Sequence, residues 1–434
     1  MANNNENKVL KSSIEREQNE LACSAEREKI KDSKNLNVPH KREQSELVCS
    51  AEREEQVTKS TASGNVPHLR FPEFCGEWKK CTINDLATVV GGGTPDTTVK
   101  SYWGGDIQWF TPSEIGKNKY VDFSLRTITR DGLDNSSAKL LPLHTILLSS
   151  RATVGECSIA SNECTTNQGF QSLIAKQCNI DFLYYLIQTK KKDLIRNACG
   201  STFLEISANE IRKIKVAVPV QNEQEQIAKL LSLVDERIAT QNKIIEDLKK
   251  LRSAIAEILF ESIQGHTVCL SDICTILKGQ QINGDCLSDT GKYYVMNGGI
   301  EPSGYYDKCN VTAETISISE GGNSCGYVQF NASPFWSGGH CYTLNDINSN
   351  ADGRYLYHFL KSHESAIMKL RIGTGLPNIQ KKDLEKFNVT LPSMAIQKST
   401  SAFLAALENK VINEEELLGK IQAQKQYFLS QMFI

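Results

Sequence analysis

This sequence of 434 residues lacks the cysteine and histidine spacings that are typical of metal sites and of a disulfide framework. Its 14 cysteines are scattered, and none lies in a Cys-x-x-Cys pair or joins a histidine at the spacing of zinc ligands. We therefore expect free thiols in a reducing cytoplasm, most of them buried as small apolar residues, and no metal site in this chain.

Apolar runs long enough to cross a membrane are missing too. No stretch approaches the roughly 20 apolar residues of a membrane span. The first residues, MANNNENKVLKSS, lack the apolar core of a signal peptide. The sequence therefore predicts a cytoplasmic protein that does not associate with membranes.

Motifs of common catalytic chemistries are also absent. No glycine-rich loop ends in Lys and Ser or Thr, and no Asn/Asp-Pro-Pro-Tyr/Phe stretch of an amino-methyltransferase occurs. Asp96 is not followed by the Glu-x-Lys arrangement of nucleases, and Ser149 and Ser150 lack the surroundings of a nucleophile elbow. We therefore expect no catalytic residue in this chain, and a stand-alone enzyme is the weakest hypothesis.

A strong excess of positive charge is the fourth feature that the sequence lacks. With 49 Lys and Arg against 51 Asp and Glu, the formal net charge is -2. A protein that held DNA phosphates by itself would be more basic, so partners would have to supply much of the positive charge. This balance keeps open a second hypothesis, a structural adaptor whose globular units bind protein.

Residues 1–64 contain no aromatic side chain and few large aliphatic ones. Such a charged segment cannot bury enough apolar surface to offset its chain entropy, so we expect a disordered tail. The tail repeats itself, because ELACSAERE at residues 20–28 recurs as ELVCSAERE at residues 46–54. This pattern indicates local duplication.

A longer repeat organises the rest of the chain. A shift of 173 residues without a gap places Gly200 on Gly373, Pro219 on Pro392 and Phe260 on Phe433. Weaker similarities precede these copies, since Thr145–Ser149 resembles Thr315–Ser319 and residues 167–170 resemble residues 337–340. The chain therefore consists of a tail and two copies of a variable unit followed by a constant unit.

The constant units have the pattern of long helices. Apolar residues recur at alternating steps of four and three, which is the heptad pattern of a coiled coil. Gln241 and Arg252 interrupt the first pattern, and Glu414 and Lys425 interrupt the second at the same places. Polar residues that match across a repeat indicate that they specify pairing. The predicted pairing residues are Ile227, Leu231, Val234, Ile238, Ile245, Leu248, Ile255, Leu259, Leu404, Leu407, Val411, Leu418, Ile421, Phe428 and Met432.

Geometry predicts that the two helices are antiparallel. Each helix of about 40 residues would be roughly 60 Å long. The second variable unit leaves the end of the first helix and returns at the start of the second, which a compact unit can do only if those points are neighbours. We therefore expect a pseudo-two-fold dumbbell. Two globular units held at a fixed distance suit the reading of a split, asymmetric DNA site, with the helices as a ruler.

Several motifs resemble those of type I restriction-modification specificity subunits. The strongest is VAVPVQNEQEQIA at residues 216–228, in which a strand ends at Pro and Glu-Gln-x-x-Ile-Ala opens the central helix. The second copy keeps the proline, at Pro392, but MAIQK at residues 394–398 lacks the Glu-Gln pair, which leaves the local contacts of that turn open. Further resemblances lie at residues 66–78, 92–95, 109–112, 149–155, 166–170 and 200–206.

The resemblance implies an α+β fold, in which two mixed α/β target-recognition domains are separated by two long antiparallel coiled-coil helices. It implies two modification subunits and added restriction/translocase subunits, which would hold S-adenosylmethionine, ATP and Mg²⁺, with double-stranded DNA as the ligand. The expected divisions are the tail 1–64, a first recognition domain 65–218, a central helix 219–262, a second recognition domain 263–393 and a C-terminal helix 394–434.

Residues that could read DNA should lie on loops and carry donors, acceptors or cations. Asn and Gly are also ordinary turn formers, and Trp103 and Trp336 could equally be structural aromatic residues. The candidates are Thr94, Trp103, Lys117, Lys119, Arg151, Asn167 and Gln168 in the first unit, and Asn297, Asn323, Tyr327, Lys369, Arg371 and Asn378 in the second.

Overall fold

The computed structural model describes residues 64–200, 204–373, 375 and 377–434. Apart from Gly64, the predicted tail and its repeats lie outside these residues. Residues 65–434 form one compact unit. Within the described residues, no helix is long and apolar enough to span a membrane.

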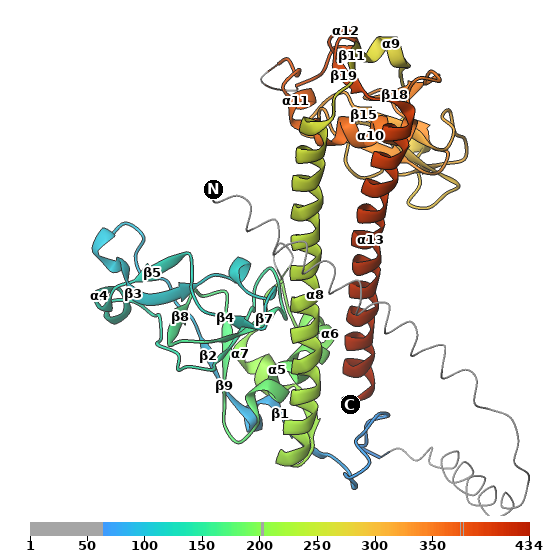
Figure 1. Cartoon of the computed structure of the whole chain (residues 1–434). Coiled ribbons are helices and arrows are strands. Elements are labelled where there is room, and N and C mark those ends of the chain that lie inside the picture. Colours follow the sequence, from blue (N-terminus) through green and yellow to red (C-terminus); the bar gives the residue numbers. More distant parts are fainter. Residues whose placement is uncertain (1–63, 201–203, 374, 376) are drawn as a thin grey trace, which may run out of the picture. The chain divides into compact units, whose positions relative to one another are not determined.

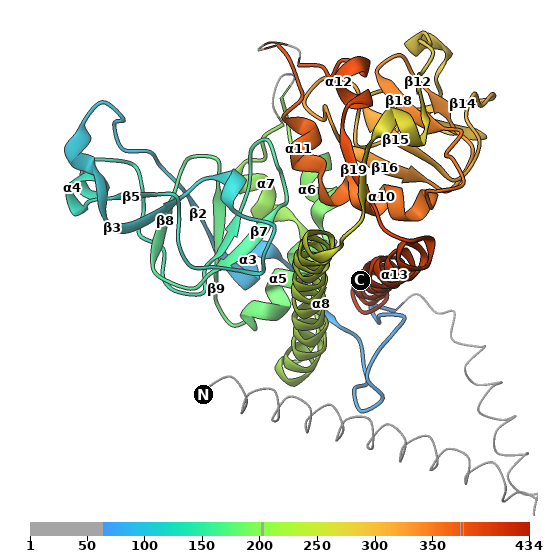
Figure 2. The same ribbon diagram turned by 45° about the horizontal axis from the view of Figure 1, so that its top comes forward.

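Two long helices form the constant units. Helix α8 covers Gln221–Ser262 and helix α13 covers Met394–Gln431, and they lie side by side in both views (Figures 1 and 2). Helix α8 begins two residues later than predicted, because Val220 is still extended, with φ −63° and ψ 155°.

The two helices are antiparallel, as the geometry of the repeat predicted. The Arg252 guanidinium, late in α8, lies 3.4 Å from Glu408, early in α13. At the other end, Asp235 of α8 lies 2.6 Å from Lys425 of α13. Between these ion pairs the Gln241 amide donates to the Glu414 carboxylate at 2.6 Å. Because Gln241 and Glu414 are equivalent under the 173-residue shift, they mark the pseudo-two-fold axis of the pair.

The predicted pairing residues lie on the inner faces of the helices. All fifteen are buried or half-buried, with Leu231 at 0% and Leu404 at 2% exposure. The polar interruptions Gln241 and Glu414 are buried and half-buried, respectively. The pairing of the helices therefore follows from the heptad pattern, and their direction follows from the chain connections.

The first lobe is built from small sheets. One has the strand order β2-β9-β6-β7-β4, a second has the order β5-β3-β8, and β1 pairs with β10. Its strands are β1 Lys79–Thr82, β2 Ala87–Gly91, β3 Trp103–Phe110, β4 Tyr120–Val121, β5 Arg126–Ile128, β6 Ile146–Leu148, β7 Cys157–Ala160, β8 Cys164–Thr166, β9 Gln171–Ala175 and β10 Lys215–Val218. Its α-helices are α3 Ile83–Leu86, α4 Arg130–Asp134, α5 Ile180–Thr189, α6 Lys191–Arg196 and α7 Ala208–Lys213.

The second lobe repeats this plan with fewer strands. One sheet has the order β12-β18-β15-β16, another has the order β14-β13-β17, and β11 pairs with β19 as β1 pairs with β10. Its strands are β11 His266–Cys269, β12 Thr275–Lys278, β13 Tyr293–Met296, β14 Tyr305–Tyr306, β15 Thr315–Ser319, β16 Val328–Asn331, β17 Trp336–Ser337, β18 Cys341–Asn345 and β19 Asn388–Leu391. Its α-helices are α9 Leu270–Ile273, α10 Gly353–Ser362, α11 Glu364–Met368 and α12 Lys381–Glu385.

Equivalent aromatic contacts hold each lobe on the helices. The Phe433 ring, two residues beyond the end of α13, stacks on Phe182 of α5 at 5.3 Å. The Phe260 ring of α8 meets Tyr355 of α10 edge-on at 5.7 Å. Both partners of the first contact are related to those of the second by the 173-residue shift. The lobes therefore pack at opposite ends of the helix pair, each with its own apolar core.

A buried glutamine ties each lobe to the helix that follows it. The Gln224 amide donates to the Pro219 carbonyl at 3.0 Å and accepts from the Asn179 backbone N–H at 3.0 Å. Gln397 repeats both bonds with Pro392 and Asp352, at 2.9 and 2.8 Å. The second turn therefore keeps the main contact of the first despite its different sequence.

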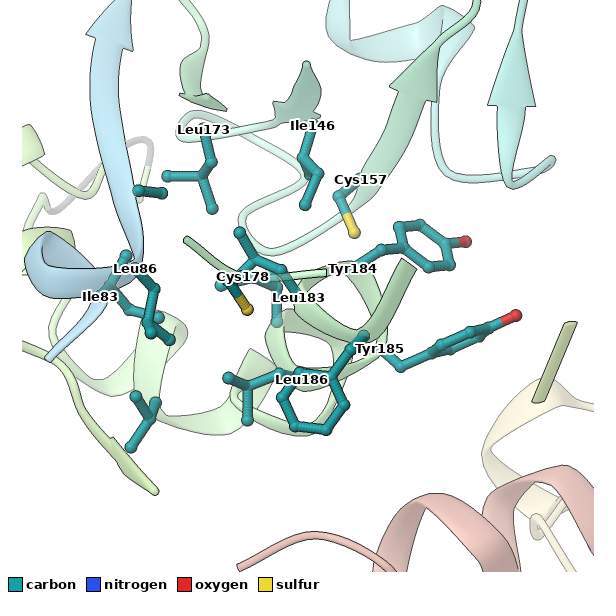
Figure 3. Packing of buried hydrophobic residues seen from close by; sticks show 14 of the residues in the cluster. Ile83, Leu86, Ile146, Cys157, Leu173, Cys178, Leu183, Tyr184, Tyr185 and Leu186 are labelled. Atoms are coloured by element: carbon teal, nitrogen blue, oxygen red, sulfur yellow. The ribbon is translucent and has the colours of Figure 1, made fainter. Parts of the chain in front are cut away.

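The core of the first lobe lies between its sheet and α5. Figure 3 shows Ile146, Leu173 and Cys157 facing residues of α5, with Tyr184 and Tyr185 at one side of the cluster. Strand β6 is apolar without interruption, and its residues Ile146, Leu147 and Leu148 are all 0% exposed. Such continuous runs are typical of strands that are covered on both faces.

Candidate nucleic-acid interface

Four segments of the first lobe meet where β2 and β6 end and β9 begins. We define this first loop cluster as residues 92–94, 149–151, 166–170 and 204–206. Backbone hydrogen bonds join them, from Gly93 to Thr166 at 2.8 Å, from Ser150 to Gly169 at 2.8 Å and from Ile206 to Ser150 at 2.9 Å.

The second lobe contains an equivalent cluster. We define this second loop cluster as residues 278–281, 319–323, 337–341 and 378–379. Gln280 donates to Ser337 at 2.8 Å, Glu320 to His340 at 2.9 Å and Ile379 to Glu320 at 2.9 Å. Each bond has its counterpart in the first lobe, so the two clusters share one backbone framework.

A glycine permits the close approach of loops in both clusters. A Cβ atom on Gly92 would lie 2.0 Å from the Asn167 carbonyl oxygen, and one on Gly279 would lie 2.2 Å from the Gly338 carbonyl oxygen. Any larger residue would push the two loops apart. The Gly-Gly-Thr-Pro motif of the first lobe therefore has a packing role.

Four of the seven candidates in the first lobe come together in its loop cluster. The Thr94 hydroxyl bonds to the Gln168 side chain, and the Asn167 side chain accepts from the Gly169 N–H at 2.9 Å, which shapes the turn. Arg151 pairs with Glu205 at 2.6 Å while about half of its side chain stays exposed. Gln168 and Arg151 are the exposed members.

The other three candidates lie elsewhere. The Lys119 ammonium contacts Asp181 at 2.7 Å and Ser232 of α8 at 2.6 Å, so it links the lobe to the helix pair; we withdraw it as a DNA contact. Lys117 is exposed and lines a cavity beside α8. Trp103 packs edge-on against Trp109 at 5.0 Å and carries the Arg126 guanidinium on its ring, as a structural aromatic residue would.

Five of the six candidates in the second lobe lie in or beside its loop cluster. The Asn297 side chain accepts from the His340 N–H at 3.2 Å. Asn378 pairs with Ile372 and Gly321 through the backbone. The pairing with Ile372 brings its neighbour Arg371 beside the cluster. The exposed residues among the five are Asn323, Lys369 and Arg371.

The Tyr327 side chain packs against α10, although its carbonyl oxygen accepts from Ser319 of the second cluster at 2.9 Å. The Lys361 ammonium of α10 sits 3.8 Å from the centre of its ring. Burial, followed by the charge of Glu364, raises the pKa of its hydroxyl. We therefore withdraw Tyr327 as a DNA contact as well.

The second cluster contains three charged or polar side chains that the sequence analysis missed. The Glu320 carboxylate is 9% exposed and accepts from Lys278 at 2.6 Å and from the Tyr342 hydroxyl at 3.0 Å. Its other oxygen lies 3.6 Å from the His340 ring. The similarity of Thr145–Ser149 to Thr315–Ser319 places Glu320 at the position of Ser150. A charged residue where the first lobe has a serine was therefore the signal in the sequence that could have pointed to Glu320.

Lys278 and His340 add exposed donors to this surface. About half of the Lys278 side chain and 61% of the His340 side chain are exposed. The first cluster presents Arg151 and Gln168 on the same framework. The two lobes therefore offer different donors and acceptors in equivalent places, which is how different base edges would be distinguished.

Comparison with known proteins identifies the family. The family model described as "Type I restriction modification DNA specificity domain" matches residues 76–250 and 265–423, once for each half of the repeat. The chain belongs to this family of type I specificity subunits. Its predicted membership and fold class are therefore confirmed.

Known specificity subunits resemble the chain over most of its length. The type I restriction enzyme MjaIX specificity subunit of Methanocaldococcus jannaschii is 28% identical over 82% of this chain and 91% of its own length. The crystal structure of the specificity subunit from M. genitalium has a TM-score of 0.55 at 21% identity, over 85% of this chain and 99% of that one. A chain from a study of type I complex assembly and conformational transition has a TM-score of 0.56 at 14% identity. The two structural likenesses show the fold.

Proposed function

We propose that this specificity subunit reads a bipartite, asymmetric DNA site, with each lobe reading one half. The observation that carries the proposal is the pair of equivalent loop clusters, one in each lobe, on lobes that pack at opposite ends of an antiparallel helix pair. We take residues 65–218 and 263–393 as the two reading domains. The helices between them would fix the spacer between the half-sites.

The residues proposed to face DNA are exposed or half-exposed side chains in the two clusters or beside them. Their polar groups suit base edges, and their cations suit phosphates. They are Thr94, Arg151, Asn167 and Gln168 in the first lobe, and Lys278, Asn297, Asn323, His340, Lys369, Arg371 and Asn378 in the second.

We further propose that modification subunits dock on one face of the helix pair. Ile244, Leu251 and Ile258 of α8 are 40–66% exposed although apolar, and each directly precedes a pairing position. Ile396, Phe403 and Leu417 of α13 hold the corresponding place and are 36–49% exposed. Equal heptad positions of antiparallel helices lie on the same side of the pair, so these residues form one apolar stripe.

Docking of two modification subunits fits the pseudo-two-fold repeat, because both helices contribute apolar residues to the stripe and the 173-residue shift relates Ile244 to Leu417. These subunits and the added restriction/translocase subunits would hold S-adenosylmethionine, ATP and Mg²⁺. Substitution of Leu251 or Phe403 by Glu should abolish co-purification with the modification subunit. Leu233→Glu is the matched control, since Leu233 is 53% exposed on another face of α8. Equal loss in the control would refute this docking face.

The reading function is tested by mapping methylated adenines. The chain is co-expressed with its modification subunit, and the methylated motif is determined with and without it. Exchange of residues 70–218 for those of another family member should change one half of the motif and leave the other. A change in both halves, or in neither, would contradict the modular proposal. Complex formation without any methylated motif would favour the adaptor hypothesis.

A further inference from the structure

A single carboxylate joins three elements at the junction between the first lobe and the helix pair. Asp235 of α8 accepts a hydrogen bond from the Tyr185 hydroxyl of α5 at 2.6 Å. The Lys425 ammonium of α13 lies 2.6 Å from its other oxygen. The side chains of Asp235 and Lys425 are only 19% and 16% exposed. We call these three residues the first clamp.

The second lobe is held in the same way. Glu408 of α13 accepts from the Tyr357 hydroxyl of α10 at 3.1 Å. The Arg252 guanidinium of α8 lies 3.4 Å from the same carboxylate, and the two charged side chains are 27% and 30% exposed. Tyr357, Glu408 and Arg252 form the second clamp.

The clamps are related by the internal repeat. The 173-residue shift takes Asp235 to Glu408 and Arg252 to Lys425, so the carboxylate and the cation exchange helices, as a two-fold axis requires. The tyrosines are offset by one position, since Tyr185 is the sixth residue of α5 and Tyr357 the fifth of α10. Each lobe is therefore held by the same three groups, a carboxylate, a cation and a tyrosine hydroxyl, although the loops of the two lobes differ.

Each tyrosine hydroxyl is held in its donating form. Burial raises the pKa of both Tyr185 and Tyr357, and the hydrogen bond and charge of the neighbouring carboxylate raise it further. The bond is a neutral donor to a charged acceptor, which is stronger than a bond between neutral groups.

The clamp attaches each lobe at a point beyond the buried glutamine. In the first lobe Lys119 adjoins it, bound to Ser232 of α8 at 2.6 Å and to the Tyr185 hydroxyl at 3.3 Å. In the first lobe, Gln224 already binds the start of α5, and Asp235 follows eleven residues later on α8, about 16 Å along the helix. One polar attachment on an apolar contact permits rotation of the lobe, whereas two attachments at this separation do not. The same reasoning holds for Gln397 and Glu408 on α13.

We propose that the two clamps fix the orientation of each recognition lobe on the helix pair and thereby restrict the spacer length that the two lobes can read together. The proposal rests on the bipartite reading function. Its physical basis is the geometry of the DNA helix, because one base pair more or less displaces a half-site by about 3.4 Å and rotates it by about a tenth of a turn. A lobe that can pivot tolerates this change, and a clamped lobe does not.

The test is the double variant Tyr185→Phe, Tyr357→Phe, which removes both hydroxyl groups and keeps both rings. Purified complex with the modification subunit is given DNA carrying the native half-sites at the native spacer and at spacers one base pair longer and shorter. We expect unchanged half-sites and a rise of about tenfold in methylation at the altered spacers relative to the native one, the size expected when a hydrogen bond to a charged group is lost.

Tyr355→Phe is the matched control. Its hydroxyl lies on the same helix as Tyr357 but donates within the lobe, to the Thr390 carbonyl at 2.8 Å, so it should destabilise the lobe without relaxing the spacer. Unchanged spacer selectivity in the double variant, or an equal loss of methylation at every spacer, would overturn the clamp proposal. A wild-type complex without a bipartite motif would instead refute the proposed function.

Discussion

The two halves of this specificity subunit share the contacts that hold each lobe on the helices, but they differ in the residue that precedes the shared glutamine. Both keep the buried glutamine, the clamp, the loop cluster and the aromatic contact between Phe433 or Phe260 and the lobe. They differ at the residue before the glutamine, which is Glu223 in the first half and Ile396 in the second. Glu223 is 0% exposed, whereas Ile396 is 44% exposed.

This difference follows from what precedes each lobe. The first lobe is entered from residues 65–78, and Glu223 binds that segment through two bonds of 2.8 Å from Arg70 and one of 3.3 Å from Trp78. The second lobe is entered from α8, which leaves no such segment to hold. A repeat therefore keeps what both copies need and changes where the chain connections differ.

The largest expected effect comes from removing Glu223. Glu223→Ala should lower the free energy of unfolding by about 3–5 kcal/mol, since the nearly buried Arg70 loses its only carboxylate partner among the described residues and keeps only the carbonyls of Cys75 and Gly76. Ile396→Ala, at the equivalent exposed place, should cost less than about 0.5 kcal/mol. Urea unfolding of both variants checks the asymmetry, which equal losses would contradict.

Acid should weaken the second half selectively. Burial lowers the pKa of His358 from 6.5 to about 4, so the unfolded chain takes up this proton first. The stabilisation is complete above pH 6.5 and falls by about 3 kcal/mol as the pH drops to about 4. The residue equivalent to His358 is Tyr185, which does not titrate there.

The His358→Phe variant checks this expectation. It keeps an aromatic ring beside Tyr357 and should lose less stability than the wild type between pH 6.5 and 4, with hydrogen exchange showing the gain in residues 263–393. Identical pH profiles for variant and wild type would mean that His358 is protonated in the fold.

The shared glutamines should give equal, intermediate effects. Gln224→Ala and Gln397→Ala each leave a buried proline carbonyl and a backbone N–H without a partner. Each should cost about 1–3 kcal/mol, measured by urea unfolding. If only one substitution were harmful, the two attachment points would not be equivalent.

The smallest effect distinguishes the two helices. Gly419 lies inside the continuous helix α13, where α8 has Glu246 at the equivalent place. A Cβ atom added to Gly419 would meet nothing within 4 Å. Gly419→Ala should therefore stabilise the protein by about 0.5–1 kcal/mol. A loss of stability in thermal unfolding would show that the glycine serves a close contact.

The helices and their direction could be predicted from the sequence, whereas the reading surface could be predicted only in part. Heptad spacing and the matched polar positions Gln241 and Glu414 depend on local order along the chain. The place of Lys119, by contrast, depends on contacts with Asp181 and Ser232 that no local pattern encodes. His340 and Lys278 were missed for the same reason, because they lie on two separate segments that meet only at Glu320.

The ruler role is tested most directly by shortening both helices by one heptad. Deletion of residues 242–248 and 415–421 removes equivalent segments, preserves the heptad phase and keeps both clamps in register. The pair becomes about 10 Å shorter, so the mapped methylation motif should keep both half-sites and have a shorter spacer. An unchanged spacer in a folded, active complex would contradict the account.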